Sequence, residues 1–439
     1  MIAATSWFLT TLAGLGLVLT VALSDAETRR RWRDGQERVL LIALALTTGL
    51  LADHAAGVIT GSLRFQAGLA WVGGLGAIAV LIFLARAPMP ARPQWTAYLA
   101  IGLISLLALA VYAAPLLEWD ARSIWFFHAK AIFFDGGLKA SPFWNNPAYD
   151  WSHKDYPELL PMLAARYAAF TGAWNEFAPK GALVPLAAAG FLGLLAAAPA
   201  AFPVLAPAAV ILLGASLWNG YMDGWIAVYG AVAALSAAAW IGNGRRPYLI
   251  LCAAALGVAL CLKNEGQLLA LAMLPAILWA ARRRRLGWLD LSALIALVPF
   301  ALWLVVKAKL GLQGGLEGVG LAHRALVVAG DSHELFYRLS YLAKDAFVRT
   351  HLFGAIGAWL AVGLCMGFSR PALVCGVSAA LYGGGLVMVY LGTPFDFAWH
   401  VGTSLDRVLL APTLLFLCGV STMIPDVLSA IRKAASPVS

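Results

Sequence analysis

Long apolar stretches follow one another along almost the whole chain, with short polar gaps between them. A helix needs about 20 apolar residues to cross the hydrocarbon core of a bilayer, where every backbone group must be hydrogen-bonded within a helix or a closed barrel. Charged residues make up 12% of the chain, about half the share found in soluble domains. A soluble fold could not hide so much apolar surface, so the sequence predicts an all-α polytopic membrane protein.

Thirteen stretches are apolar enough to be predicted as transmembrane helices. They are residues 3–23, 39–61, 67–85, 95–117, 180–198, 203–218, 224–241, 248–263, 266–281, 287–310, 352–368, 371–391 and 407–424. We divide the chain into an N-terminal three-helix segment (1–94), a membrane domain that holds the functional site (95–431) and a cytoplasmic tail (432–439), which we expect to be disordered.

Basic residues cluster in the short gaps, and such clusters mark the cytoplasmic ends of spans. The clusters are Arg29, Arg30, Arg31 and Arg33; Arg86 and Arg92; Arg245 and Arg246; Arg282 to Arg285; Arg370; and Arg432 with Lys433. Thirteen crossings with the N-terminus outside place all of them in the cytoplasm. A fourteenth crossing at 159–173 would violate this twice, so we expect a short re-entrant or half-buried helix there. The net charge of +9 then reflects orientation, and nucleic acid is excluded as a partner.

The first large outer loop, Glu118 to Glu158, concentrates polar chemistry. It holds six of the 22 acidic residues: Glu118, Asp120, Asp135, Asp150, Asp155 and Glu158. Lys130, His128 and His153 lie among its many aromatic residues. A plain connector between two helices needs only a few residues, so this loop is predicted to form a site. A second large outer loop is predicted at 311–351.

A helix is predicted near the start of the first loop. At 100° per residue, Asp120, His128 and Asp135 share one arc, while four phenylalanines share another: Phe126, Phe127, Phe133 and Phe134. This pattern favours a helix in the membrane interface, with its aromatic side in the lipid headgroups and its polar side upward. The alternative is an aromatic anchor with solvated charges.

Glu118 and Asp120 stand where a span meets water. A carboxylate there can act as a general base, and partial burial by the neighbouring tryptophans would raise its pKa toward a useful range. The pair could also bind a divalent cation, but two carboxylates are a thin ligand set. At the end of the loop, Tyr156-Pro157 forces an extended or turned approach to the next helix. That brings His153, Asp155 and Glu158 back to the membrane surface.

Further ionisable residues fall at the ends of predicted spans, and each needs a partner or water there. They are Asp223, Lys263, Glu265, His400, Asp406 and Arg407. Lys263 and Glu265 could form only a local ion pair, and Asp406 with Arg407 could anchor the start of a helix. Alternatively, Arg407 or His400 on the outer face would suit a lipid phosphate. Asp53-His54 is interpreted as a polar pair between helices or near the interface.

These motifs resemble the GT-C superfamily of membrane glycosyltransferases, which includes protein O-mannosyltransferases and lipid A aminoarabinose transferases. Those enzymes have many spans and a long first outer loop, where an acidic residue follows the span and interfacial helices come next. Glu118-Trp119-Asp120 is similar to the acidic position, 125–134 to the first interfacial helix, and 156–161 to the Pro-rich start of the following helix. The segments 263–266 and 400–407 also look like bacterial members.

The resemblance covers about residues 95–424, with two departures. Three spans precede the acidic loop where many members have one, and the acids read Glu-x-Asp instead of two adjacent carboxylates. The second departure leaves open which acid is the base, with Asp120 preferred.

The resemblance implies an inverting transferase in the bacterial inner membrane that acts on the periplasmic side. The donor would be a polyprenyl-phosphate sugar, and its phosphate would sit among Lys130, Lys263, Arg407 and His400. Asp120 would deprotonate a hydroxyl of a lipid, glycan or protein acceptor. The other site candidates would contact substrate: Glu118, His128, His153, Asp155, Tyr156, Glu158, Asp223 and Glu265. No cofactor is needed, and a divalent metal is not required.

Two other functions remain open from the sequence. A multi-span transporter would fit the many helices, although no repeat relates two halves and the polar residues avoid the midplane. An oligosaccharide or O-antigen ligase would use the loop at 311–351 for a diphosphate, with Arg324, Arg338, Lys344 and Arg349 as contacts. The sequence names neither the sugar nor the acceptor.

Overall fold

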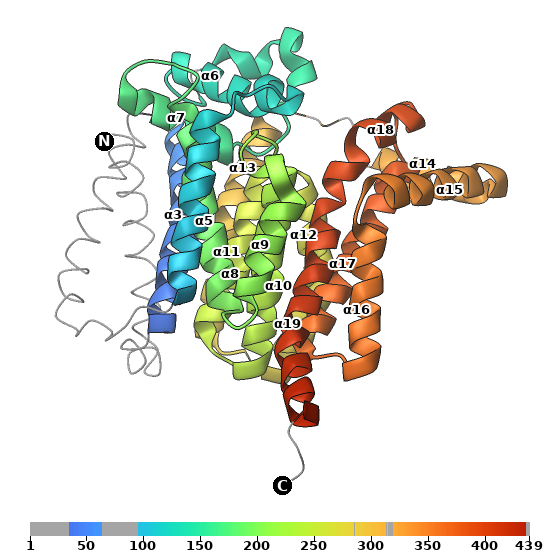
Figure 1. The fold of residues 1–439 in the computed structure, drawn as a ribbon. Helices are drawn as coiled ribbons and strands as arrows, with labels where there is room; N and C mark the ends of the chain where they lie inside the picture. The colour runs from blue at the N-terminus through green and yellow to red at the C-terminus, as the bar shows by residue number, and fades with distance from the viewer. Residues whose placement is uncertain are drawn as a thin grey trace, which may run out of the picture.

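A computed structural model describes residues 35–63, 95–139, 141–284, 286–312, 314 and 319–435. Every element in these ranges is helical, and they contain no strand, as predicted. The helices of the bundle are α3 (Gly35–Thr60), α5 (Trp95–Ala113), α8 (Leu183–Ala197), α9 (Phe202–Leu213), α10 (Asp223–Asn243), α11 (Arg246–Leu262), α12 (Glu265–Arg284), α13 (Val298–Lys309), α16 (Leu352–Met366), α17 (Arg370–Leu391) and α19 (Leu410–Ala435). They run side by side, while α6 (Phe126–Phe134), α14 (Val319–Gly330), α15 (Ser332–Arg349) and α18 (Phe397–Val408) gather at one end (Figure 1).

Seven helices in the described ranges are long and apolar enough to cross a membrane, or eight if the bent pair of α15 and α16 is one span. The predicted spans 203–218, 248–263 and 266–281 correspond to shorter apolar helices. The predicted spans 3–23 and 67–85 lie outside the described residues. The chain is therefore a helical protein with the apolar helices of a multi-pass membrane protein.

Helix α10 is the centre of the bundle and contacts α8, α11, α12, α17 and α19. It is rich in Ala and Gly, and small residues allow helices to approach closely where lipid gives no hydrophobic driving force. The α8 side supplies Gly190, where an added Cβ would lie 2.6 Å from Val228 Cγ1. The α8–α10 contact thus depends on the missing side chain.

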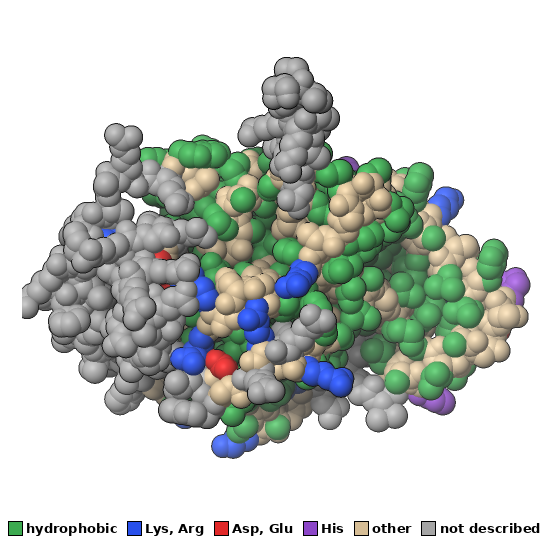
Figure 2. Space-filling model, turned by 90° about the horizontal axis from the view of Figure 1, so that it is seen from below, with side chains coloured by type: hydrophobic (Ala, Val, Ile, Leu, Met, Phe, Trp, Pro, Cys, Tyr) green, Lys and Arg blue, Asp and Glu red, His purple; other side chains and the backbone are tan. Residues whose placement is uncertain are grey.

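One end of the bundle, here called the basic end, is held by arginines. Arg245 donates to both carboxylate oxygens of Glu37, at 2.5 and 2.6 Å, and so joins the turn before α11 to the start of α3. Arg284 donates to the carbonyl oxygen of Gly242 at 2.7 Å, near the end of α10 where the helix dipole favours a cation. Figure 2 looks onto this end and shows its Lys and Arg side chains.

The other end, here called the loop end, carries Glu118 to Glu158. After α5 the chain forms a π-helical turn η1 (Ala121–Trp125), then α6, and two 3-10 turns η2 (Pro142–Asn145) and η3 (Pro147–Ser152). The predicted interfacial orientation is wrong in part. Phe126 is buried in the core and Phe127 is covered by Phe143, Tyr149 and Trp151, so only Phe134 of the predicted aromatic arc is largely exposed.

The predicted polar arc also fails. His128 is fully buried, and its two ring nitrogens bond Glu158 at 2.7 Å and the Ser152 carbonyl at 2.9 Å. Asp135 instead accepts a hydrogen bond from Ser141 at 2.5 Å. These contacts tie α6 to the rest of the loop. The π-helical turn η1 lies between Asp120 and α6, so a count at 100° per residue fails for Asp120. His128 lies on the regular helix α6 and is turned inward because its partners Glu158 and Ser152, from the end of the loop, cover that side of the helix.

The doubtful segment 159–173 is α7 (Leu159–Thr171), a 13-residue helix that is almost wholly buried. The chain on both sides of it lies at the loop end, with Asp155 bonded to Asn264 and Lys180 bonded to the Ala114 carbonyl. Its Arg166 forms a buried ion pair with Asp53 of α3. Asp53 is therefore a polar group between helices, as interpreted from the sequence, and its partner is Arg166.

Two further expectations change. The segment 311–351 is mostly helix, since it contains α14 and α15, and α15 lies at 83° to α16. The tail predicted from residue 432 is partly helical, because α19 continues to Ala435.

Candidate functional site

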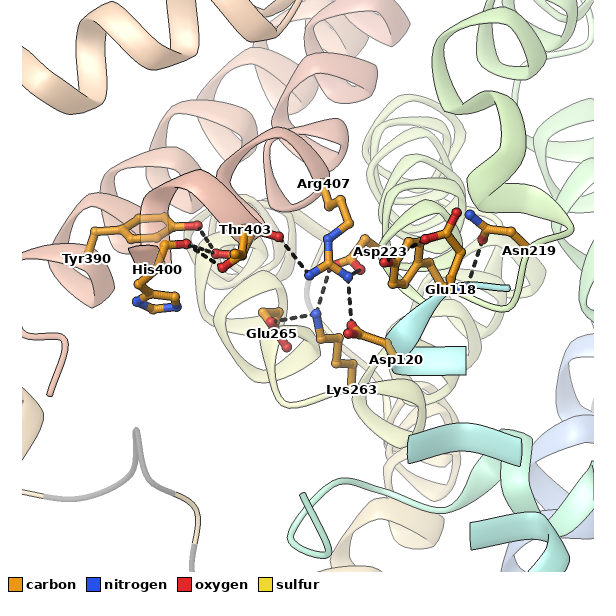
Figure 3. A network of polar contacts seen from close by, with 12 residues as sticks. Glu118, Asp120, Asn219, Asp223, Lys263, Glu265, Tyr390, His400, Thr403 and Arg407 are labelled. Atoms are coloured by element: carbon orange, nitrogen blue, oxygen red, sulfur yellow. Dashed lines mark hydrogen bonds and ion pairs between the residues drawn. The ribbon is translucent and has the colours of Figure 1, made fainter. Parts of the chain in front are cut away.

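Five charged residues meet at the loop end and form what we call the charged network (Figure 3). Arg407 Nη1 lies 2.7 Å from an oxygen of Asp120 and 3.8 Å from an oxygen of Asp223. Lys263 Nζ lies 2.8 Å from the other oxygen of Asp223 and 2.9 Å from Glu265. The network thus holds three carboxylates and two cations in a continuous chain of ion pairs.

Each member of the network stands at a helix end. Asp120 precedes η1 and makes no capping hydrogen bond there, so its carboxylate is available to Arg407. Asp223 opens α10, Lys263 and Glu265 flank the break between α11 and α12, and Arg407 lies in the last turn of α18. This placement is expected because a charge at mid-membrane is costly. The helix ends, far apart in sequence, meet where the bundle meets the first loop.

The position of Arg407 corrects one sequence alternative. Asp406 and Arg407 do not anchor the start of a helix, because they lie at the end of α18. Arg407 also donates to the Thr403 carbonyl at 3.1 Å, and Asp406 lies 3.5 Å from Arg349 of α15. The local pair of Lys263 with Glu265 does exist, but Asp223 joins it, so it belongs to the larger network.

Tyr221 connects the network to Glu118. Its ring lies under the Arg407 guanidinium at 4.2 Å, and its hydroxyl donates to Glu118 at 3.0 Å. Burial raises the pKa of Tyr221 to about 12, although Arg407 opposes the shift. The phenol therefore stays protonated and acts as a donor. Through Tyr221, both acids of the predicted Glu118/Asp120 pair are fixed around one arginine.

The Tyr221 turn depends on Gly220. Its φ is +91°, a region that side chains rarely adopt, and an added Cβ would lie 2.7 Å from the Cβ of Ala121. Asn219 closes the same turn, because its side chain accepts from the Tyr221 N–H at 3.0 Å. Gly220 thus allows this turn to lie directly against η1, which follows Asp120.

The end of the first loop lies beside the network. Asp155 accepts a hydrogen bond at 2.8 Å from Asn264, which stands between Lys263 and Glu265. His153 stacks on Tyr156 with ring centroids 5.1 Å apart and has φ +55°, which is unusual for a residue other than glycine. Burial lowers the pKa of His153, with Asp155 and Asp120 acting in the opposite direction. His153 is therefore mostly neutral near pH 7.

His400 lies on the α18 side of Figure 3. Its Nδ1 is 2.8 Å from Thr393 Oγ1, and its carbonyl accepts from Ser404 Oγ at 2.7 Å. Ser404 in turn is 2.8 Å from the Tyr390 hydroxyl. His400 thus belongs to a separate neutral cluster that joins α17 to α18 next to the charged network.

Two carboxylate oxygens of the network are buried without a hydrogen-bond partner in the described part of the chain. They are Oδ2 of Asp223 and Oε2 of Glu265. The cations also retain donors. Arg407 has five N–H bonds, of which two are used in hydrogen bonds to Asp120 and Thr403. Among the described residues, no group of three or more His, Cys, Asp or Glu is placed to hold a metal ion.

Four predicted substrate contacts, His153, Asp155, Tyr156 and His400, lie beside the network, and three others have no contact with it. His128 and Glu158 are fully buried and bind each other, so they hold the loop instead of facing an open side of the site. Burial raises the pKa of Glu158, while His128 opposes the shift. Lys130 is exposed on α6 and makes no contact with the charged network.

Sequence reasoning missed three residues that build the site: Tyr221, Asn264 and Thr403. Tyr221 lies two residues before Asp223, and Asn264 stands between Lys263 and Glu265, which were singled out in the sequence. The sequence signal that could have found Tyr221 and Asn264 is that each lies close in sequence to a predicted site acid. Thr403 contributes only its backbone carbonyl, which a sequence pattern cannot reveal.

No family model, curated protein or solved structure matches this chain. The glycosyltransferase resemblance therefore remains an expectation drawn from the motifs. Any functional conclusion rests on the charged network and on the surfaces around it.

Proposed function

We propose that the chain is an inverting glycosyltransferase that moves a sugar from a polyprenyl-phosphate donor to an acceptor hydroxyl, on the periplasmic side of a bacterial inner membrane. The observation that carries the proposal is the ion pair of Asp120 with Arg407 at the loop end. It places a partly open carboxylate beside a guanidinium with unused N–H donors. A proton acceptor and a phosphate ligand are the two groups that such a transfer needs.

The two ends of the bundle support the proposed orientation. Arg245, Arg246 and Arg284 lie at the basic end, and positive charge next to spans favours the cytoplasm. The charged network lies at the opposite end. A thirteen-span GT-C-like arrangement, which includes the two spans outside the described residues, is the architecture that we propose around it.

In the proposed reaction, the acceptor hydroxyl gives its proton to Asp120. The acceptor oxygen bonds to the anomeric carbon from the face opposite the phosphate, and the bond from that carbon to the phosphate oxygen breaks. The electron pair leaves with the phosphate, which changes from a diester to a monoester with an additional negative charge. Arg407 stabilises this charge, in the manner of preorganised donors aimed at developing negative charge.

Asp223 offers Arg407 a second carboxylate partner. Oδ2 of Asp223 has no hydrogen bond among the described residues and lies 3.8 Å from Arg407 Nη1. When donor phosphate and acceptor approach, Arg407 shifts from Asp120 toward Asp223 and keeps a carboxylate partner. Asp120 is then free to accept the proton. Glu118, held by Tyr221, orients the acceptor at the same edge.

The test compares three variants in nanodiscs with native membrane lipids and acceptors. Polyprenyl-phosphate mannose, glucose, galactose and aminoarabinose serve as labelled donors. Asp120→Asn should reduce sugar transfer about 100- to 10,000-fold, the usual contribution of a general base, and Glu118→Gln should reduce it less. Asp135→Asn is the matched control, because Asp135 lies in the same loop and binds Ser141 outside the network. Wild-type turnover in Asp120→Asn and Glu118→Gln would refute the proposal.

The orientation has its own test. Cys365 is the exposed cysteine of the chain and is first replaced by Ala. A new cysteine at Asn145, exposed in the first loop, should react with a membrane-impermeant maleimide in spheroplasts. A cysteine at Gly242, near the basic end with open space around its Cβ position, should react only after lysis. The reverse pattern would place the site in the cytoplasm and end the proposal.

The ligase alternative loses support from the contacts of its arginines. Arg324 donates to the Gly392 carbonyl at 2.7 Å and Arg338 to the Leu391 carbonyl at 3.0 Å, so both cap the end of α17. Arg349 pairs with Asp345 at 2.9 Å. Residues with these intramolecular roles are poor candidates for a diphosphate site, and we do not propose one.

A further inference from the structure

Two exposed tryptophans stand beside the charged network. Trp119 lies between Glu118 and Asp120 in sequence and is 54% exposed, and Trp151 is 49% exposed. Their rings meet edge to face with centroids 6.3 Å apart. Large aromatic rings of a loop usually cover each other or the core, as Phe143 and Trp144 do here. This pair instead leaves about half of each residue uncovered, next to the proposed base.

The orientation of Trp151 is fixed. Its indole N–H donates to the Ala148 carbonyl at 2.8 Å, and one ring face stacks on Phe127 with centroids 5.2 Å apart. Trp151 is nevertheless 49% exposed, so part of its surface stays uncovered. Trp119 makes no hydrogen bond through its indole to the described residues, so that donor is also available. The pair presents a rigid aromatic surface together with a spare N–H.

Carboxylates adjoin both rings. Glu118 and Asp120 flank Trp119, and Asp150 precedes Trp151 with its side chain 67% exposed. A sugar ring has the complementary chemistry, because one face of C–H bonds packs on the negative face of an aromatic ring and the hydroxyls at its rim donate to carboxylates. Each acid has one partner in the chain, which is Tyr221 for Glu118, Arg407 for Asp120 and Lys154 for Asp150. A carboxylate has more lone pairs than one partner uses, so these acids can also accept from sugar hydroxyls, which an apolar ligand lacks.

We propose that Trp119 and Trp151 form a subsite that stacks on a sugar ring next to Asp120. This rests on the proposed transferase function and deepens it, since it makes one substrate ring a saccharide bound outside the ion pairs. The ring belongs either to the donor sugar or to a glycan acceptor. The chemistry of recognition is the same for both, and kinetic measurements separate them.

Direct binding is measured first, without turnover. Protein in nanodiscs is applied to an array of immobilised oligosaccharides of mannose, glucose, galactose and arabinose. The wild type should retain at least one glycan class, and Trp119→Ala and Trp151→Ala should each weaken retention about tenfold, the upper range for one aromatic contact. Trp151→Tyr should recover part of the binding and Trp151→Leu should not, because only Tyr restores a ring.

Trp399 supplies the matched control. It is 59% exposed on α18 and meets Phe395 edge to face at 6.0 Å, but lies outside the subsite. Trp399→Ala should bind glycans as the wild type does. If the wild type retains no glycan, or if the three Ala variants behave alike, Trp119 and Trp151 are interfacial anchors of the kind common at membrane surfaces, and the proposal is overturned.

Two further measurements keep the subsite and the transferase function separable. Glycan binding by the wild type without any sugar transfer would refute the function and leave the subsite standing. Where transfer occurs, Trp151→Ala should raise KM about tenfold for one substrate. A rise for the acceptor assigns the ring to a glycan acceptor, and a rise for the donor assigns it to the donor sugar. Unchanged KM for both would overturn the subsite alone.

Discussion

Lys263 and Asp223 do not depend on each other equally, and this asymmetry is measurable. Lys263 Nζ has two carboxylates close by, Asp223 at 2.8 Å and Glu265 at 2.9 Å. Asp223 has Lys263 at 2.8 Å and only a distant second cation, Arg407 at 3.8 Å. Lys263→Met therefore removes the nearest cation from two buried or half-buried acids. Asp223→Asn leaves Lys263 paired with Glu265.

The distances give the size of the effect. At an effective dielectric constant of 20, the attraction is about 6 kcal/mol at either short distance and about 4 kcal/mol at the longer one. Most of this is offset by desolvation, and removing one partner of a buried pair costs a net of about 3–5 kcal/mol. We expect Lys263→Met to lower the free energy of unfolding by about 5 kcal/mol, the upper end. Asp223→Asn should cost about 2–3 kcal/mol, because Lys263 keeps Glu265.

The double variant tests the coupling. Asp223→Asn with Lys263→Met removes both charges, so its cost should be less than the sum of the single costs by at least about 1 kcal/mol. Unfolding in mixed micelles, followed by circular dichroism as SDS is added, measures all three variants. Lys344→Met, an exposed lysine of α15, should change stability by no more than about 0.5 kcal/mol. A larger loss for Asp223→Asn than for Lys263→Met, or additive costs, would refute the pairing.

Three other outcomes follow from the site. Gly220→Ala should lower stability by about 1–3 kcal/mol in the same titration, because it places a Cβ against Ala121 at a φ of +91°; an unchanged midpoint would contradict this. His153 has a pKa below the ordinary 6.5, so the unfolded chain binds the proton first and stability falls as pH drops below about 6.5; His153→Gln should flatten that fall between about pH 7 and 5. Arg407→Gln should reduce kcat at least about 100-fold with a smaller change in KM, and Arg407→Lys should recover part of it.

The helices were predictable because their signals are local. Every predicted span within the described ranges overlaps a helix, although three of these helices are shorter than a span and the first half of 287–310 is a 3-10 helix. The placement of basic loops and polar loops at opposite ends of the bundle was also predictable, because clusters of basic residues mark one end of the spans. The same alternation argues against a crossing at 159–173, and the chain before and after α7 lies at the loop end.

The pairings were not predictable, because they depend on how helix ends meet. Asp120 and Arg407 are 287 positions apart in the sequence. The sequence likewise does not indicate which helix packs on Asp53, and in the structure its partner is Arg166 of α7. The error at His128 has a different cause. Periodicity gives the positions of residues around α6 but not which side of the helix the end of the loop covers, and Glu158 covers the side that carries His128.

The charge of the network bears on how an anionic substrate could react there. Three carboxylates outnumber Lys263 and Arg407 by one before any substrate binds, and a phosphodiester adds another negative charge. During the proposed transfer the phosphate gains one more, but the acceptor proton moves to Asp120 in the same step. The total charge of the phosphate and the network therefore stays constant. One negative charge moves from Asp120 to the phosphate beside Arg407. A site with more carboxylates than cations can thus favour the departure of the phosphate, because the carboxylate of Asp120 receives the acceptor proton.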